Sequence, residues 1–327
     1  LSIEVLQLKD VDLTYQNWSN DQSYELSFEE CFMTSNSLLD SVDANIKFTG
    51  NIPSLKTGNF KLQNPIGLEG EFNIKLTDDA LGFYYEGKFA SGNAVFNGSI
   101  DFYDKTEKWN IQCELLSQNI KELLAVIPAE FKDESLKNLK GDLSTNVKIK
   151  GNRINNIFPS IEVYFDFSQG RLKFLKNEIK EINLKGFYFQ PDITSINGAK
   201  VNVNMCSAEC SGITFRGEGS ASDFNNPFIS ANIQSSFNLK NLHHLALREE
   251  FNTLTGEADF DIDFSGNILG FFSNSKRELK KFQSKGRMIF SDVIAQPSDF
   301  DFPINIHSGQ LNFSNQDLVF DSFKGKI

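Results

Sequence analysis

A two-residue alternation of apolar and polar side chains limits this chain more than any other property of its sequence. Val42, Ala44, Ile46 and Phe48 alternate with polar residues, and the same pattern recurs from Leu68 to Leu76, Leu143 to Ile149, Ile161 to Phe167, Ala199 to Met205 and Ala258 to Phe264. Such alternation is typical of strands with one dry and one wet face, whereas strands of a parallel α/β sheet are apolar on both faces. The sequence therefore predicts a mainly β fold built from antiparallel strands.

Helical signals are few and short. Ile120, Leu123, Leu124 and Ile127 have helical spacing and are followed by Pro128, which predicts a helix near 118–127. Leu239, Leu242 and Ala246 predict a second helix near 239–250, and Ser275 with Glu278 matches a capping box before a third. We expect these helices to be brief interruptions between strands.

One unit of the pattern repeats. A helix beginning at Asn119 is followed by Gly141, an alternating strand and Gly151, and a helix beginning at Asn238 is followed by Gly256, an alternating strand and Gly266. The two glycine pairs are 256 − 141 = 115 and 266 − 151 = 115 positions apart. Repetition of a supersecondary unit indicates a chain that adds similar strands along one axis, and it favours an elongated architecture.

The repeat divides the chain into three predicted segments. Residues 1–152 form a first β-groove segment, residues 153–267 a second repeat, and residues 268–327 the start of a further, truncated segment. The chain begins at Leu1 and stops within a strand-like pattern, so we expect it to be part of a longer protein.

Composition excludes some partners. The formal charge is −11, so we expect no nucleic-acid binding. The longest apolar run, Leu123 to Ile127, is far shorter than the roughly 18–20 residues that span a bilayer. The chain holds 32 Phe against 7 Tyr and 2 Trp, and Phe offers apolar area without a polar group, which mildly favours a lipid partner.

No catalytic or metal-binding motif is complete, and we expect neither cofactor nor metal. Asp259, Asp261 and Asp263 resemble the opening of a calcium loop, but Phe264 occupies the glycine position, so a solvated strand face is expected. Adjacent His243 and His244 are poorly spaced for chelation. A change of parity near Met205 and Cys206 suggests a bulge or turn that could admit a Cys206–Cys210 disulfide, although free thiols are favoured among Cys31, Cys113, Cys206 and Cys210.

A basic cluster stands out in this acidic chain. It comprises Lys276, Arg277, Lys280, Lys281, Lys285 and Arg287. Lys276, Arg277, Lys280 and Lys281 are candidate contacts for anionic headgroups or an acidic partner, and a solvated charged helix is the alternative.

A series of short motifs follows one another along the chain: Leu8 to Tyr15, Asn119 through Gly141, Phe158 to Leu172, Gly198 to Val203, Gly217 to Gly219, Pro227, and Leu239 to Leu242. This order of elements resembles the AsmA-like family of bacterial envelope proteins. It covers residues 1 to about 267 and includes no catalytic motif.

The resemblance implies a long, curved antiparallel sheet that forms an open apolar groove, as in repeating β-groove lipid-transfer proteins. It also implies a non-enzymatic role in carrying phospholipid between the inner and outer membranes, a periplasmic location, an inner-membrane anchor absent from this chain, and outer-membrane components as further partners. The alternating strands supply the expected groove lining, namely Phe72, Ile74, Phe96, Val147, Ile149, Val163, Phe165, Phe167, Val203, Phe260, Ile262 and Phe264.

Two alternatives stay open at the level of sequence. Alternation fits β-sandwich domains equally well, because a strand needs the same apolar face to pack against a second sheet as to contact an acyl chain. A β-sandwich adhesion or structural module of the cell surface is therefore the second hypothesis. A carbohydrate-active enzyme with two facing carboxylates is a weaker third, and the scarcity of Trp and Tyr speaks against it.

Overall fold

The structure is a computed structural model of the full chain. It describes residues 5–17, 22–38, 40–57, 60–61, 65–103, 106–126, 138–154, 157–174, 177–245, 249–267, 283–315 and 317–326. The chain divides into two compact units: unit 1 comprises Leu1–Ser168 with Phe189–Ser195, and unit 2 comprises Gln169–Tyr188 with Ile196–Ile327. The three predicted segments follow the repeat instead of this division, and they stay predictions.

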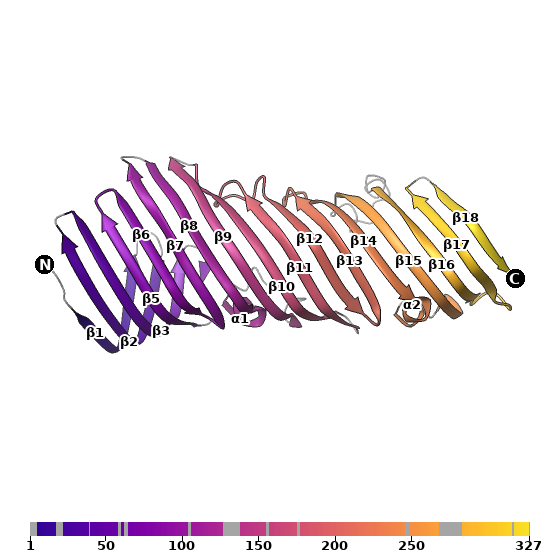
Figure 1. The fold of residues 1–327 in the computed structure, drawn as a ribbon, viewed down its shortest axis with the longest axis horizontal. Coiled ribbons are helices and arrows are strands. Elements are labelled where there is room, and N and C mark those ends of the chain that lie inside the picture. Colours follow the sequence, from indigo (N-terminus) through magenta and orange to yellow (C-terminus); the bar gives the residue numbers. More distant parts are fainter. Residues whose placement is uncertain are drawn as a thin grey trace. The chain divides into compact units, whose positions relative to one another are not determined.

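Unit 1 is built on an antiparallel sheet whose strands lie side by side in chain order (Figure 1). Its elements are β1 (Leu6–Asn17), β2 (Gln22–Leu38), β3 (Ser41–Thr57), β4 (Phe60–Lys61), β5 (Ile66–Thr77), β6 (Ala80–Phe89), β7 (Gly92–Tyr103), β8 (Thr106–Asn119), α1 (Ile120–Val126) and β9 (Lys140–Ile154). The pairing runs β1–β2–β3–β5–β6–β7–β8–β9, and the short β4 pairs with the end of β3.

The boundary between the units falls in β10 (Ser160–Phe174) and β11 (Asn177–Gln190). Unit 2 continues with β12 (Lys200–Cys210), β13 (Ile213–Ser222), β14 (Phe228–Asn238), α2 (Leu239–Leu245), β15 (Phe251–Asn267), β16 (Gln283–Pro297), β17 (Ile304–Ser314) and β18 (Leu318–Lys326). From β12 to β18 each strand pairs antiparallel with the next one along the chain.

The predicted mainly β fold class is confirmed, and the alternating stretches of the sequence lie in strands, except that Ala199 immediately precedes β12. Among the described residues, the strands of each unit all belong to sheet ladders between neighbours, so neither unit contains a second sheet. β-sandwich domains are therefore not what these residues form.

Tight turns explain why consecutive strands pair. Ala90 has a φ of 53° between β6 and β7, and Ser211 and Gly212 have φ values of 53° and 79° between β12 and β13. Two-residue hairpin turns need such left-handed backbone, because its twist matches the twist of the flanking strands. The register also shifts between Val203 and Cys206, which confirms the irregularity predicted there.

The predicted repeat has a structural counterpart. Gly141 and Gly256 have φ values of 138° and 110°, and Gly151 and Gly266 have values of 138° and 158°. Both helices also begin alike. The Lys121 amide donates to Asn119 Oδ1 at 3.0 Å and the Lys240 amide donates to Asn238 Oδ1 at 2.9 Å, as expected of N-cap residues. The third predicted helix, at Ser275 to Phe282, lies outside the described residues.

Candidate binding face

The register gathers the apolar side chains of unit 1 on one face of its sheet. Directly opposed residues of antiparallel strands share a face, so rows of partners can be followed across the sheet. One row runs Leu6, Met33, Ile46, Phe72, Tyr85, Phe96, Cys113 and Val147 from β1 to β9. A neighbouring row from β3 to β9 runs Ala44, Ile74, Phe83, Gly98, Ile111 and Ile149. We call this side the apolar face of unit 1.

Tyr85 fills a gap that two glycines leave in this face. A Cβ atom at Gly70 would lie 2.9 Å from Tyr85 Cε2, and one at Gly87 would lie 2.8 Å from the Tyr85 hydroxyl. The Tyr85 ring is 4% exposed, and its hydroxyl donates to the Lys88 carbonyl at 2.7 Å. Burial, and then the charge of Glu69, raises the pKa of Tyr85 to about 12. Tyr85 is thus a structural part of the face.

Unit 2 has an apolar face of the same kind. A row from β12 to β18 runs Cys206, Gly217, Ile233, Ile262, Gly286, Phe313 and Leu318. A second row runs Ala208, Phe215, Ser235, Phe260, Met288, Leu311 and Phe320. Val203 and Phe264 lie on this side as well, because Val203 pairs with Gly219, which pairs with Ala231 opposite Phe264.

The apolar face of unit 2 is packed near α2 and more open away from it. Leu239 of α2 is buried with the core cluster Ile213, Phe237, Leu254, Ala258, Val293 and Ala295. Further from α2 along the same strands, Val203, Ile262 and Phe264 are only half-buried. The helix therefore covers one end of the face and leaves the other end accessible.

Strands β3, β5 and β7 of unit 1 show a similar gradient of exposure. Ile66 and Ala94 are buried in the half of the sheet from which α1 starts. At the opposite strand ends, Val42, Leu76 and Phe102 are 41%, 45% and 38% exposed. A hollow of about 340 Å³ lies on this face at the other strand ends, next to β1, where Leu13 and Tyr15 are 45% and 53% exposed. It is lined by Leu13, Thr14, Tyr15, Tyr24, Leu26 and Ile52.

The register places most of the expected lining residues on the two apolar faces, and their role as a lipid lining stays a prediction. Phe72, Ile74, Phe96, Val147 and Ile149 share the apolar face of unit 1, and Val203, Phe260, Ile262 and Phe264 share that of unit 2. Val163, Phe165 and Phe167 alternate along β10. All are half-buried except Phe167, which is 6% exposed because its ring lies where a Cβ at Gly141 would be.

Sequence reasoning missed the apolar residues of β6. Phe83 and Tyr85 belong to the apolar face, but Tyr84 between them is also aromatic and lies on the other side, 40% exposed. The run of three aromatics hides the alternation. The glycines that flank it, Gly82 and Gly87, offered no clearer signal.

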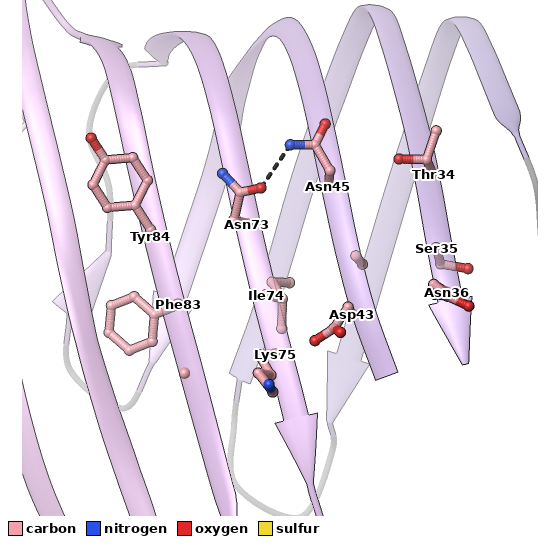
Figure 2. A pocket seen from close by; sticks show the side chains of 12 residues that line it. Thr34, Ser35, Asn36, Asp43, Asn45, Asn73, Ile74, Lys75, Phe83 and Tyr84 are labelled. Atoms are coloured by element: carbon pink, nitrogen blue, oxygen red, sulfur yellow. Dashed lines mark hydrogen bonds between the residues drawn. The ribbon is translucent and has the colours of Figure 1, made fainter. Parts of the chain in front are cut away.

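The opposite face of each sheet is polar and cross-linked. In unit 1, the Asn45 side-chain amide donates to Asn73 Oδ1 at 2.7 Å and also to Glu71. That hydrogen bond, together with the nearby Lys47, lowers the pKa of Glu71. A hollow of about 650 Å³ across β2, β3, β5 and β6 mixes residues of both faces, including Ile74 and Asn73 (Figure 2).

In unit 2, the three aspartates of β15 lie on the polar face, as predicted. Asn232 donates to Asp261 at 2.8 Å and to Asp263 at 3.0 Å. Lys285 and Arg287 of β16 face these carboxylates at 3.6 and 3.8 Å. Within the described ranges, no three His, Cys, Asp or Glu side chains come together as a metal-binding group.

Other expectations are resolved in part. All four cysteines are free thiols. The candidate headgroup contacts Lys276, Arg277, Lys280 and Lys281 lie outside the described residues. Of the helices that the structure describes, neither has the length and apolar character needed to cross a bilayer.

Comparison with known proteins adds no assignment: no protein-family model, curated protein or solved structure matches the chain.

Proposed function

We propose that this chain is a non-enzymatic lipid-binding and lipid-transfer module of the bacterial cell envelope. One observation carries the proposal: in each unit, the apolar side chains of successive strands share one face that the described residues cover only partly. Large apolar surfaces are rarely left open to water in monomeric soluble proteins, and those that persist usually mark binding sites. Acyl chains are an occupant that such a face would shelter from water.

The chemistry of the apolar faces suits hydrocarbon. These faces are rich in Phe, Ile and Val, which offer no hydrogen-bonding side chain. Among its described residues, neither unit has a second sheet that could bury the apolar face. The alternative hypothesis of an adhesion module assumed a β-sandwich, so it has less support. The resemblance to AsmA-like proteins supports phospholipid as the ligand, the periplasm as the location, and the inner and outer membranes as partners.

A matched pair of variants tests the proposal. Ile262 lies on the apolar face between Ile233 and Gly286, whereas Ile289 lies on the polar face between Asp259 and Gln310. Ile262→Asn should reduce phospholipid carried by protein purified from bacteria by about tenfold, because burying one aliphatic side chain is worth about 1.5–3 kcal/mol. Ile289→Asn should leave the bound lipid unchanged. Native mass spectrometry measures both.

Circular dichroism and thermal unfolding serve as folding controls for each variant. If the wild-type chain carries no lipid, or if folded Ile262→Asn and Ile289→Asn carry equal amounts, the apolar face is not a lipid site.

A further inference from the structure

Two charged residues, Glu107 and Arg153, lie on the apolar face of unit 1. On β8, Glu107 has the same parity as Trp109, Ile111 and Cys113, and it pairs with Arg153 of β9. Across β5 to β9, the described residues that share this face include no other charged side chain. The pair stands next to Phe102, at the strand ends away from α1, where the face is exposed.

The two charges are held in a defined arrangement. Arg153 Nη1 lies 3.0 Å from Glu107 Oε1 and 3.4 Å from Oε2. The Trp109 indole donates to Glu107 Oε2 at 2.9 Å, and the Arg153 guanidinium lies 5.5 Å from the centre of the Phe158 ring. An indole, a phenyl ring and an ion pair thus form one cluster, which we call the rim cluster.

The rim cluster keeps binding capacity on both charges. The Arg153 and Glu107 side chains are 46% and 32% exposed. Both contacts to Glu107 use the same guanidinium nitrogen, whereas an arginine presents five N–H donors. A carboxylate has about four acceptor positions, and the Trp109 and Arg153 contacts use only some of them.

We propose that the rim cluster binds the headgroup of a zwitterionic phospholipid, with Arg153 on the phosphate and Glu107 on the ammonium group. This inference rests on the proposed lipid-binding function and deepens it. Guanidinium groups suit phosphate oxygens, and a carboxylate suits an ammonium donor. A purely anionic headgroup would instead meet the Glu107 charge at close range. Trp109 provides the amphipathic ring that suits the boundary between headgroup and hydrocarbon.

The acyl chains would then continue from the rim cluster onto the adjoining apolar rows. Trp109 is followed on the same face by Ile111 and Cys113, which oppose Ile149 and Val147. These side chains are half-buried and uncharged. Headgroup and tail therefore have neighbouring sites of matching chemistry within one unit.

Lipid loading of the full chain tests the inference. The protein is incubated separately with vesicles containing phosphatidylethanolamine, phosphatidylglycerol or diacylglycerol, and bound lipid is counted by native mass spectrometry. The wild type should load phosphatidylethanolamine about tenfold more than phosphatidylglycerol, the effect expected of hydrogen bonds to charged groups. Glu107→Gln should abolish that preference, and Arg153→Gln should lower loading of both phospholipids while diacylglycerol is unaffected.

Lys88→Gln is the matched control, because Lys88 forms an ion pair with Glu69 at 2.8 Å on the polar face. It should leave all three loadings unchanged. Equal loading of the two phospholipids by the wild type, or a preference that survives Glu107→Gln, would overturn the headgroup site while diacylglycerol loading upholds the apolar face. Failure to load any of the three lipids would overturn the proposed function and the headgroup site together.

Discussion

Gly256 allows a local bend in β15. Its φ is 110°, and a Cβ at this position would lie 2.6 Å from the Asp292 carbonyl oxygen and 2.7 Å from Val293 Cα. Asp292 itself has a φ of 50°, and the register between β15 and β16 shifts at Gly256. Bulges of this kind bend a strand and re-aim the side chains beyond it.

Replacing Gly256 by Ala should therefore destabilise the protein. Backbone strain at such a position costs about 1–3 kcal/mol, and the clash with backbone atoms adds to it. Gly67→Ala is the control, because a Cβ there meets nothing within 4 Å. Urea unfolding measures both, and an equal effect of the two substitutions would contradict the strained geometry.

The thiol of Cys113 is a probe of how strongly the apolar face of unit 1 is buried. It lies between Phe96 and Val147, and burial, followed by the charge of Glu114, raises its pKa from 9.0 to about 11. The folded protein thus holds the thiol proton more tightly than the unfolded chain does. The stability that this contributes is present below pH 9.0 and is lost as pH rises through about 11.

Alkylation of Cys113 should follow the same titration, because the thiolate is the nucleophile. In a variant with Cys31, Cys206 and Cys210 replaced by Ala, we expect the rate of reaction with iodoacetamide to rise with a midpoint near pH 11. A midpoint near 9.0, the value of an unburied thiol, would show that this part of the face is open to water.

At the scale of elements, α2 acts as a cover for one end of an apolar face. Asn238 caps it, Leu239 is 4% exposed, and Leu242 packs against the same core cluster. The His243 ring nitrogen lies 2.8 Å from the Phe251 carbonyl oxygen, which ties the helix to the start of β15. A seven-residue helix is too short to be stable alone, so packing must hold it in place.

Leu239→Ala should accordingly cost about 2–4 kcal/mol of unfolding free energy, as expected for truncating a buried leucine. The neighbouring exposed residue gives the control, Lys240→Ala, which should change stability by less than about 0.5 kcal/mol. Denaturant unfolding followed by circular dichroism distinguishes them. Similar values for the two variants would mean that α2 does not depend on its contact with the sheet.

At the scale of the whole molecule, the repeat and the two-sided strands act together. Gly141 in β9 and Gly256 in β15 both have a positive φ, and each strand has an apolar and a polar face. In each unit, successive strands thereby form one apolar face and one polar face. The polar faces are cross-linked by pairs such as Asn232 with Asp261 and Lys88 with Glu69, which favours exposure of that side to water.

The apolar and polar faces of most strands and the starts of both helices could be predicted from short stretches of sequence. The alternation at Phe72 and Ile74 or at Phe260 and Ile262 assigns each side chain to one side of its strand, because successive residues of a strand point in opposite directions. Asn119 and Asn238 are residue types that favour the N-cap position, and they indicated where the two helices begin. The sequence pattern does not predict the apolar side of β6, because Tyr84 breaks its alternation of apolar and polar residues.

Neighbours in space could not be predicted in the same way. The cross-strand partners of Glu107 and Trp109 depend on register, and a shift of one residue would move both to the opposite face. Burial of Phe167 in β10 depends on its contact with Gly141 of the preceding strand, β9. The pattern of residues along a strand thus specifies which side is apolar, whereas contacts between distant segments specify where that side is packed, where it is open, and which charges stand at its edge.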